Sequence, residues 1–256
     1  MDYLLANYQG YKLFNGNLQN LPDLPKVVVN TINQYSYCIA EKDVAFKKVL
    51  QNSDVLLPDG VGIVIAIKAT SGKVIEKISG ADMHRELLAD LNSKKGSCFY
   101  LGSKDSTLQK IEERMQAEYK NIFCNYYAPP FSDQFTSAEN DLIIAKINEV
   151  KPHVLFVGMT APKQEKWVAE NKDRIDAKII CSIGAVFDFY AGTVERPSPF
   201  WVDHGLEWFI RLCKEPRRMW KRYLYYGPIF VSSIIKEKLK YNLHRDNVTG
   251  DVLELD

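Results

Sequence analysis

The chain has 256 residues, a net charge of +1 and 46% hydrophobic residues, which is ordinary for a globular protein with one large α/β domain and an appendage. It has no run of 18 uncharged apolar residues, and MDYLLANYQGYK at the start lacks basic residues ahead of an apolar stretch. We therefore expect neither a membrane-spanning helix nor a signal peptide. The five cysteines are widely spaced without a CxxC pair, which predicts free thiols in a reducing cytoplasm.

Apolar strand-like runs alternate with helical patterns along residues 1–195. A β-branched strand over 26–33 precedes a helical pattern through Phe46 and Leu50, and the next strand ends at Pro58, which cannot donate a ladder hydrogen bond. Later strands and helices follow in the order 63–67 (helix), 82–91 (helix), 97–103 (strand), 108–119 (helix), 121–127 (strand), 138–150 (helix), 153–159 (strand), 163–171 (helix) and 177–185 (strand). This alternation predicts a Rossmann-like α/β fold, a mostly parallel sheet with helices on both faces.

Ligands of such sheets bind beyond the carboxyl ends of the strands. Polar residues or glycines stand at five predicted strand ends, which indicates a nucleotide-sized crevice: Thr31 and Asn33, Asp59 and Gly60, Gly102 and Ser103, Gly158, and Gly184. Asp59 is the strongest candidate for chemistry, because Gly60 and Gly62 after it allow a ligand to approach closely. The alternative, in which Asp59 only caps the next helix, is equally compatible with the local sequence.

Several common cofactor and metal signatures are missing. Gly60-Val61-Gly62 is followed by Ile65 where a dinucleotide fingerprint needs a small residue, and there is no GxxxxGK[ST] loop. No two aspartates stand two residues apart, and the histidines lack ligand spacing. We expect no cofactor and no metal, so that an anionic leaving group is stabilised by main-chain N–H groups, helix ends and basic side chains.

The segment VGMTAPKQEKWV (157–168) places Pro162 in the first turn of a helix. Gln164 has a donor and acceptors suited to sugar hydroxyls or a diphosphate, and it follows Gly158 at a strand end. We interpret Glu165 and Lys166 as solvated charges of this first turn.

The composition changes at Arg196. Residues 196–240 contain ten Lys or Arg against four Asp or Glu, with tryptophans and tyrosines interleaved. We predict a helical, basic and aromatic appendage over 196–256, following a catalytic domain over 1–195. A membrane surface or a lipid diphosphate is favoured over nucleic acid as its ligand, because residues 229–240 have an apolar face. A third interpretation makes the aromatics the core of a helical subdomain with solvated arginines.

These motifs together resemble a known family. NTIN, LLPDGVG, ISGAD, FYLGS, VGMTAPKQEKW, IGAVFDFYAGTVERP and GLEWFIRLCKEPRRMWKRYL, spread over residues 26–226, resemble the WecG/TagA/CpsF family of bacterial glycosyltransferases. The resemblance implies an inverting, metal-independent transferase of bacterial surface polysaccharide or wall polymer synthesis. Such enzymes move an N-acetylmannosamine-type sugar from a UDP-sugar to a polyprenyl-diphosphate-linked sugar, on the cytoplasmic face of the membrane.

The resemblance also implies roles for single residues. The family's catalytic base falls on Asp59, and its active-site threonine and glutamine fall on Thr31 and Gln164. The arginines thought to meet the acceptor diphosphate fall on Arg211, Arg217, Arg218 and Arg222. One departure is Lys77, where many members have an arginine; lysine keeps the charge but loses the bidentate fork.

Further substrate contacts are predicted at the strand ends, on Asn33, Gly60, Gly102 and Gly158. Asp188 either contacts the nucleotide or hydrogen-bonds the loop before Gly192.

Two other classes of protein remain open. One is a different nucleotide-sugar enzyme, such as an epimerase or dehydrogenase, although the missing glycine fingerprint counts against it. The other is a non-catalytic peripheral membrane or nucleic-acid-binding protein, for which the appendage suffices. We expect a peripheral protein on the inner membrane face without a nucleic-acid partner; a homo-oligomer is possible.

Overall fold

A six-stranded parallel sheet organises the chain. The computed structural model describes residues 5–195, 197–198, 200–201 and 204–250, with side chains as far as Leu239. The strand order is β4-β3-β8-β7-β5-β6, which confirms the predicted Rossmann-like α/β fold. The strands are β3 (Val27–Ile32), β4 (Val55–Pro58), β5 (Ser97–Gly102), β6 (Phe123–Tyr127), β7 (Val154–Gly158) and β8 (Ile179–Ser182).

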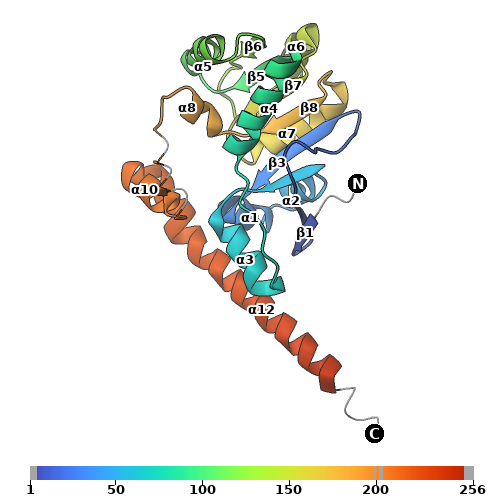
Figure 1. The fold of residues 1–256 in the computed structure, drawn as a ribbon, viewed down its shortest axis with the longest axis vertical. Coiled ribbons are helices and arrows are strands. Elements are labelled where there is room, and N and C mark those ends of the chain that lie inside the picture. The colour runs from blue at the N-terminus through green and yellow to red at the C-terminus, as the bar shows by residue number, and fades with distance from the viewer. Residues whose placement is uncertain (1–4, 196, 199, 202–203, 251–256) are drawn as a thin grey trace.

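Helices cover both faces of the sheet (Figure 1). On one face α4 (Gly80–Lys94), α5 (Asp105–Glu118) and α8 (Val186–Tyr190) pack over a cluster that includes Val29, Leu57 and Phe156. The opposite face carries α1 (Gln34–Ala40), α2 (Val44–Gln51), α3 (Val61–Ser71), α6 (Ser137–Val150) and α7 (Lys163–Asn171), the last continued by a short 3-10 helix, Lys172–Arg174. Because both faces are buried, the strands read as continuous hydrophobic runs.

The helical pattern predicted before Leu50 is divided into two helices. Asn33 caps α1 by accepting from the backbone N–H groups of Tyr35 and Ser36, at 3.0 Å each. Asp43 starts α2 by accepting from the N–H of Phe46 at 3.0 Å. A second N-cap residue therefore begins a new helix where periodicity alone suggested one.

An N-terminal hairpin, β1 (Leu5–Tyr8) with β2 (Tyr11–Phe14), was not among the predicted strands. Gln9 and Gly10 have φ of 50° and 85°, the left-handed pair that a two-residue hairpin turn requires. Residues of β2 then pack beside edge strand β4: Leu13 joins the cluster of Leu56, and Phe14 joins that of Leu57 on the other face.

The C-terminal region is helical, as predicted. It contains α10 (Glu207–Lys214), α11 (Pro216–Trp220), a π-helical turn over Lys221–Tyr225 and the long α12 (Tyr226–Gly250). Arg196, the predicted start of the appendage, lies outside the described residues. In the part of the chain that is described, no helix has both the length and the hydropathy needed to cross a membrane.

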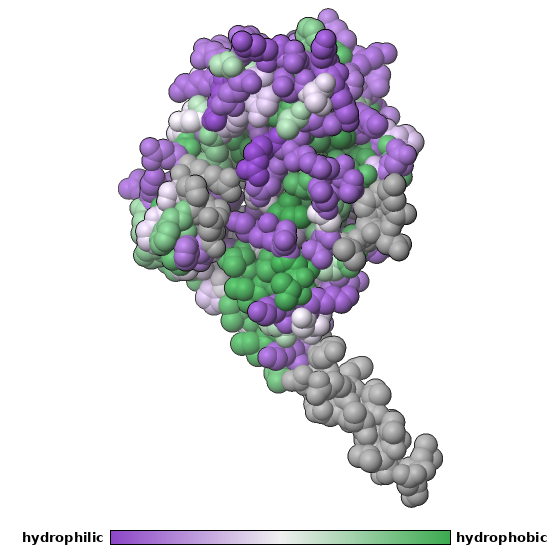
Figure 2. All heavy atoms as spheres, in the orientation of Figure 1, coloured by the Kyte–Doolittle hydropathy of each residue, from purple (hydrophilic) through white to green (hydrophobic). Residues whose placement is uncertain are grey.

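The first turns of α12 are integrated in the protein core. Tyr226 and Phe230 are buried in the cluster formed by α1, α3 and the hairpin, and the ring of Phe230 lies 5.3 Å from that of Tyr37. The other side of the helix stays open, with Val231, Ile235 and Leu239 each more than half exposed. Hydrophobic surface gathers where α3 and α12 lie side by side (Figure 2).

Candidate active site

Asp59 lies directly after β4, at the carboxyl edge of the sheet. Its N–H donates to the carbonyl oxygen of Ile32 at 2.9 Å, which ties it to the end of β3. The helix that follows, α3, has Gly60 as N-cap and no side-chain cap. The carboxylate faces α4 instead, where the N–H of Gly80 approaches Oδ2 at 3.5 Å. The alternative in which Asp59 caps the next helix is therefore wrong.

The surroundings of Asp59 change its acidity. Burial, followed by the negative charge of Glu207, raises the pKa of Asp59 to about 6 from an ordinary value of 3.8. The N–H of Gly80 and the positive charges of Lys77 and Arg211 act in the opposite direction. A carboxylate with a pKa near 6 is a better general base at neutral pH than an ordinary aspartate.

Three charged side chains surround Asp59, and we call these four residues the Asp59 cluster. Lys77, from the segment between α3 and α4, has its Nζ 3.8 Å from Oε2 of Glu207. Arg211, one turn after Glu207 on α10, has Nη1 4.0 Å from Oε1 of Glu207. The guanidinium of Arg211 also lies 5.2 Å from the ring centre of Phe189 in α8. The appendage thus delivers two charged groups to the end of β4.

The four candidate arginines divide into two pairs. Arg222 is largely enclosed beside Tyr35, whose ring centre lies 4.7 Å from its guanidinium, and burial lowers the pKa of this arginine. Burial raises the pKa of Tyr223, and the positive charges of Arg211 and Arg222 act in the opposite direction. The negative charge of Asp59 also raises this pKa. Arg217 and Arg218 are exposed, and Arg218 pairs with Glu215 at 3.2 Å. Arg211 and Arg222 therefore face the sheet domain, whereas Arg217 and Arg218 face solvent.

Thr31, Asn33 and Gly60 lie around the end of β3. Thr31 is partly buried and pairs in register with Leu57, two residues before Asp59. The Oδ1 of Asn33 is used in capping α1. Gly60 has φ of 132°, and a Cβ there would lie 3.2 Å from Oε1 of Gln34, so the backbone conformation and the close packing both explain this glycine.

Gln164 is buried below the ends of β7 and β8 rather than open to solvent. Its Oε1 accepts from the N–H of Met159 at 3.1 Å, and its Nε2 donates to Glu165 at 2.8 Å. A Cβ on Gly184 would lie 3.1 Å from the same Oε1. The protein itself therefore holds the amide in one orientation at the carboxyl edge.

The interpretation of Glu165 as a solvated charge is wrong. Its side chain is buried, and burial raises its pKa to about 7. Oε1 accepts from Gln164, while Oε2 has no partner among the described residues. Lys166 is half-buried and pairs with Asp43 at 2.5 Å. Neither charged residue of this first turn of α7 is therefore freely solvated.

Gly102, Gly158 and Asp188 lie at the same edge of the sheet. Gly102 pairs with Gly158, and a Cβ on Gly102 would lie 2.6 Å from the carbonyl oxygen of Gly158. A Cβ on Gly158 would lie 2.4 Å from the ring of Phe187. Packing within the protein explains both glycines. The main-chain oxygen of Asp188, not its carboxylate, accepts from Thr193 and Val194.

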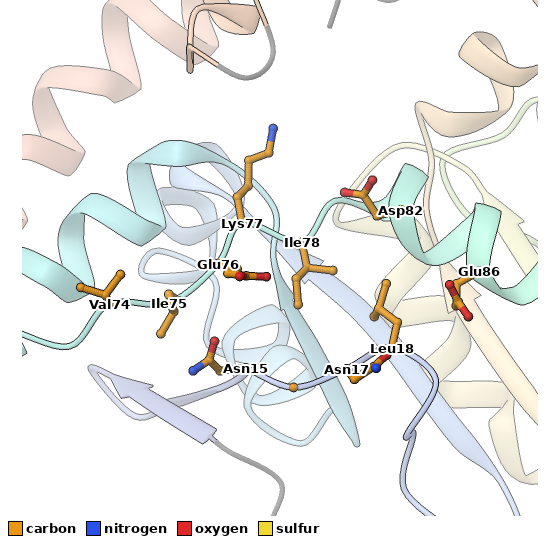
Figure 3. A pocket seen from close by; sticks show the side chains of 11 residues that line it. Asn15, Asn17, Leu18, Val74, Ile75, Glu76, Lys77, Ile78, Asp82 and Glu86 are labelled. Atoms are coloured by element: carbon orange, nitrogen blue, oxygen red, sulfur yellow. The ribbon is translucent and has the colours of Figure 1, made fainter.

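A pocket of about 740 Å³ lies beside Lys77, between the loop after β2 and the segment that leads into α4. Lys77 is the one residue it shares with the Asp59 cluster, and Figure 3 shows its ammonium pointing away from Glu76, Asn15 and Asn17. The other lining residues are Gly16, Leu18, Val74, Ile75, Ile78, Asp82 and Glu86. Within the described residues, no three His, Cys, Asp or Glu side chains gather as metal ligands.

Sequence reasoning missed Glu207 and the aromatic partners Tyr35 and Phe189. Glu207 stands four residues before Arg211 in GLEWFIR, and this i,i+4 spacing predicts that the two share one face of a helix. The approach of Tyr35 and Phe189 joins segments far apart in the chain, and no local pattern indicates it.

Comparison with known proteins shows which family the chain belongs to. The sequence model of the Glycosyl transferase WecG/TagA/CpsF family matches residues 15–244. An N-acetylglucosaminyldiphosphoundecaprenol N-acetyl-beta-D-mannosaminyltransferase of Bacillus subtilis (strain 168) is 30% identical over 211 residues, covering 82% of this chain and 80% of that protein. The enzyme of the same name from Staphylococcus aureus (strain MW2) is 25% identical over 197 residues, covering 77% and 74%. The chain belongs to the WecG/TagA/CpsF family of glycosyltransferases.

Proposed function

We propose that this protein transfers an N-acetylmannosamine-type sugar from a UDP-sugar to a polyprenyl-diphosphate-linked N-acetylglucosamine, with inversion at the anomeric carbon. The names of the two relatives, which specify N-acetylglucosaminyldiphosphoundecaprenol as acceptor, support this choice of acceptor. The observation that carries the proposal is Asp59, a carboxylate with a raised pKa at the carboxyl edge of the sheet, surrounded by cations from two other segments.

In the proposed reaction, Asp59 accepts the proton of the acceptor hydroxyl. The hydroxyl oxygen forms a bond to the anomeric carbon of the donor, and the bond from that carbon to the phosphate oxygen breaks. UDP leaves with the electron pair. General-base catalysis of this kind contributes about 10²- to 10⁴-fold, and positioning and charge stabilisation supply the rest.

Basic groups rather than a metal are proposed to hold the phosphates. We assign Lys77 and main-chain N–H groups to the leaving UDP, and Arg211 with Arg222 to the acceptor diphosphate. Both arginines are partly enclosed beside aromatic rings, where a charge-assisted hydrogen bond is stronger than it is in open water. Gln164 and Thr31 are proposed to contact the donor sugar, with the amide of Gln164 already oriented by Met159 and Glu165.

We further propose that the protein docks on the inner face of the cytoplasmic membrane through the open side of α12. Val231, Ile235 and Leu239 recur every four residues on that side, with Lys236 and Lys238 exposed beside them. An apolar stripe flanked by lysines suits the headgroup region of an anionic bilayer.

The test incubates the protein with a panel of UDP-sugars and a short-chain polyprenyl-diphosphate N-acetylglucosamine, and identifies the products by mass. We expect one disaccharide product from UDP-N-acetylmannosamine. Asp59→Asn should lower turnover by about 10²- to 10⁴-fold while leaving UDP affinity unchanged.

Asp90→Asn is the matched control, because Asp90 pairs with Lys94 at 2.7 Å on the exposed side of α4. No product from any UDP-sugar would refute the proposed function. Full activity of Asp59→Asn would remove Asp59 from the mechanism.

A further inference from the structure

Glu207 lies between two cations without forming a hydrogen bond to either. Its carboxylate oxygens are 3.8 Å from Nζ of Lys77 and 4.0 Å from Nη1 of Arg211. A charge-assisted hydrogen bond between such groups is usually about 2.7–2.9 Å long. Both cations are thus attracted to Glu207, but the N–H groups that they point toward it form no hydrogen bond with its carboxylate. These N–H groups can still donate to a ligand.

Arg211 has a further donor without an acceptor. Its Nε is completely buried and has no hydrogen-bond partner among the described residues. Packing fixes the guanidinium, because it lies over Phe189 and its helix places it one turn from Glu207. A buried guanidinium N–H with no acceptor is unfavourable, so the hydrogen bonding of Arg211 is incomplete in the free enzyme.

Lys77 and Arg211 come from different parts of the chain. Lys77 is held next to the sheet because the N–H of Ile78 donates to the carbonyl oxygen of Pro58 at 3.2 Å. Arg211 arrives on α10 of the appendage. Among the described residues, Glu207 is the anion that pairs with both, and two cations brought together without it would repel each other.

We propose that Glu207 is a positioning residue of the transfer reaction: its carboxylate holds Lys77 and Arg211 beside Asp59 in the free enzyme and gives them up to the substrate diphosphates, Lys77 to the leaving UDP and Arg211 to the acceptor. This inference rests on the proposed function. A diphosphate displaces the carboxylate because it carries more charge and more acceptor oxygens, which can reach the donors that Glu207 leaves available. Glu207 therefore keeps the site assembled while it competes with the ligand.

The same carboxylate acts on Asp59. The charged and titratable groups that face Asp59 are Lys77, Glu207, Arg211 and Tyr223, together with the N–H of Gly80. Asp59 must be deprotonated to act as a base, so turnover should rise with pH through about 6. Removing the negative charge of Glu207 removes one cause of the raised pKa, and the acid limb of the profile should move to lower pH.

The experiment compares Glu207→Gln, Glu207→Asp and the control Glu215→Gln. Glu215 is a suitable control because it lies on the same appendage with similar side-chain exposure, 26% against 23%, and pairs with Arg218 instead. Binding of inorganic pyrophosphate is measured by calorimetry in EDTA, and turnover is measured from pH 5 to 9.

We expect Glu207→Gln to bind pyrophosphate about 5- to 10-fold more tightly than wild type, which corresponds to the loss of one competing ionic contact. Its turnover should fall, and its acid limb should shift to lower pH. Glu207→Asp should retain the wild-type acid limb, because it restores the charge. Glu215→Gln should match wild type in both measurements.

Unchanged or weaker pyrophosphate binding by Glu207→Gln would overturn the inference, as would an acid limb at the wild-type pH. If Glu207→Gln does not fold, Glu207→Asp carries the test, and a shifted acid limb or altered pyrophosphate binding in the folded Glu207→Asp would overturn the inference. The pyrophosphate measurement does not depend on turnover. If no transfer is observed, the proposed function is refuted, but the pyrophosphate affinities of Glu207→Gln and wild type still test the role of Glu207.

Discussion

The two faces of the appendage have similar compositions and very different surroundings. The inner face places Arg211 over Phe189 and Arg222 over Tyr35, and it buries Tyr226 and Phe230 against the sheet domain. The outer face exposes Arg217, Arg218, Trp220 and Leu224. Basic and aromatic residues therefore have two different kinds of surroundings within one appendage. We propose that the inner set completes the active site, and the outer set is exposed to solvent.

The strongest way to break this comparison is to exchange the two pairs of arginines for alanine. Arg211→Ala with Arg222→Ala should lower turnover on a water-soluble acceptor by about 10²-fold or more, because two charge-assisted bonds in a partly enclosed site are lost. Arg217→Ala with Arg218→Ala is the matched variant and should stay within a few-fold of wild type. Equal losses of steady-state turnover in the two double variants would show that side-chain exposure does not predict which arginines matter for catalysis.

The outer face is tested by Val231→Ser with Ile235→Ser. Each side chain is more than half exposed, so the fold should survive while binding to anionic liposomes falls by about 10-fold through loss of apolar contact. Turnover on the soluble acceptor should not change. Leu142→Ser, at an exposed position on α6, is the control; an equal loss of liposome binding there would refute α12 as the docking surface.

Asp59 should reduce the stability of the folded protein. Its folded pKa of about 6 exceeds the ordinary value of 3.8, so the folded state binds the proton more tightly, and stability falls as pH rises from about 4 to 6. Asp59→Asn cannot ionise and should be more stable at pH 7.5 by about 1–3 kcal/mol. Urea unfolding at pH 7.5 and pH 4 checks this. A difference that persists at pH 4 would argue for another cause.

EDTA should have the smallest effect, leaving transfer unchanged, if Lys77 and main-chain N–H groups stabilise the leaving UDP as proposed. The assay compares initial rates before and after EDTA, with MgCl₂ or MnCl₂ added back. Strong inhibition that either metal reverses would assign the phosphate charge to a metal and not to Lys77 and the arginines.

The sheet could be predicted from the sequence because its buried strands are short apolar runs that end at or just before a turn residue. Asp59 could be placed for the same reason, since Pro58 ends its strand. The division of the arginines could not, because it depends on α10 reaching Phe189 and on the π-helical turn before α12. Glu165 was misjudged for a related reason: its burial under the ends of β7 and β8 is set by packing between distant segments.

The hairpin was missed although its signal is local, since Tyr-Gln-Gly-Tyr places glycine in a two-residue turn between aromatic residues. The two hairpin strands are short and lack the continuous apolar runs by which the strands of the sheet were predicted.

The position of the hairpin also affects self-association of the protein through the edges of its sheet. An edge strand presents unpaired backbone groups to which a second chain can add, which promotes aggregation. At the β4 edge, Leu13 and Phe14 pack on opposite sides of the sheet, so a neighbouring chain cannot extend the sheet beside Asp59 without displacing them. At the other edge, β6 carries exposed Phe123. Unwanted association between copies should therefore begin at β6, the edge remote from Asp59.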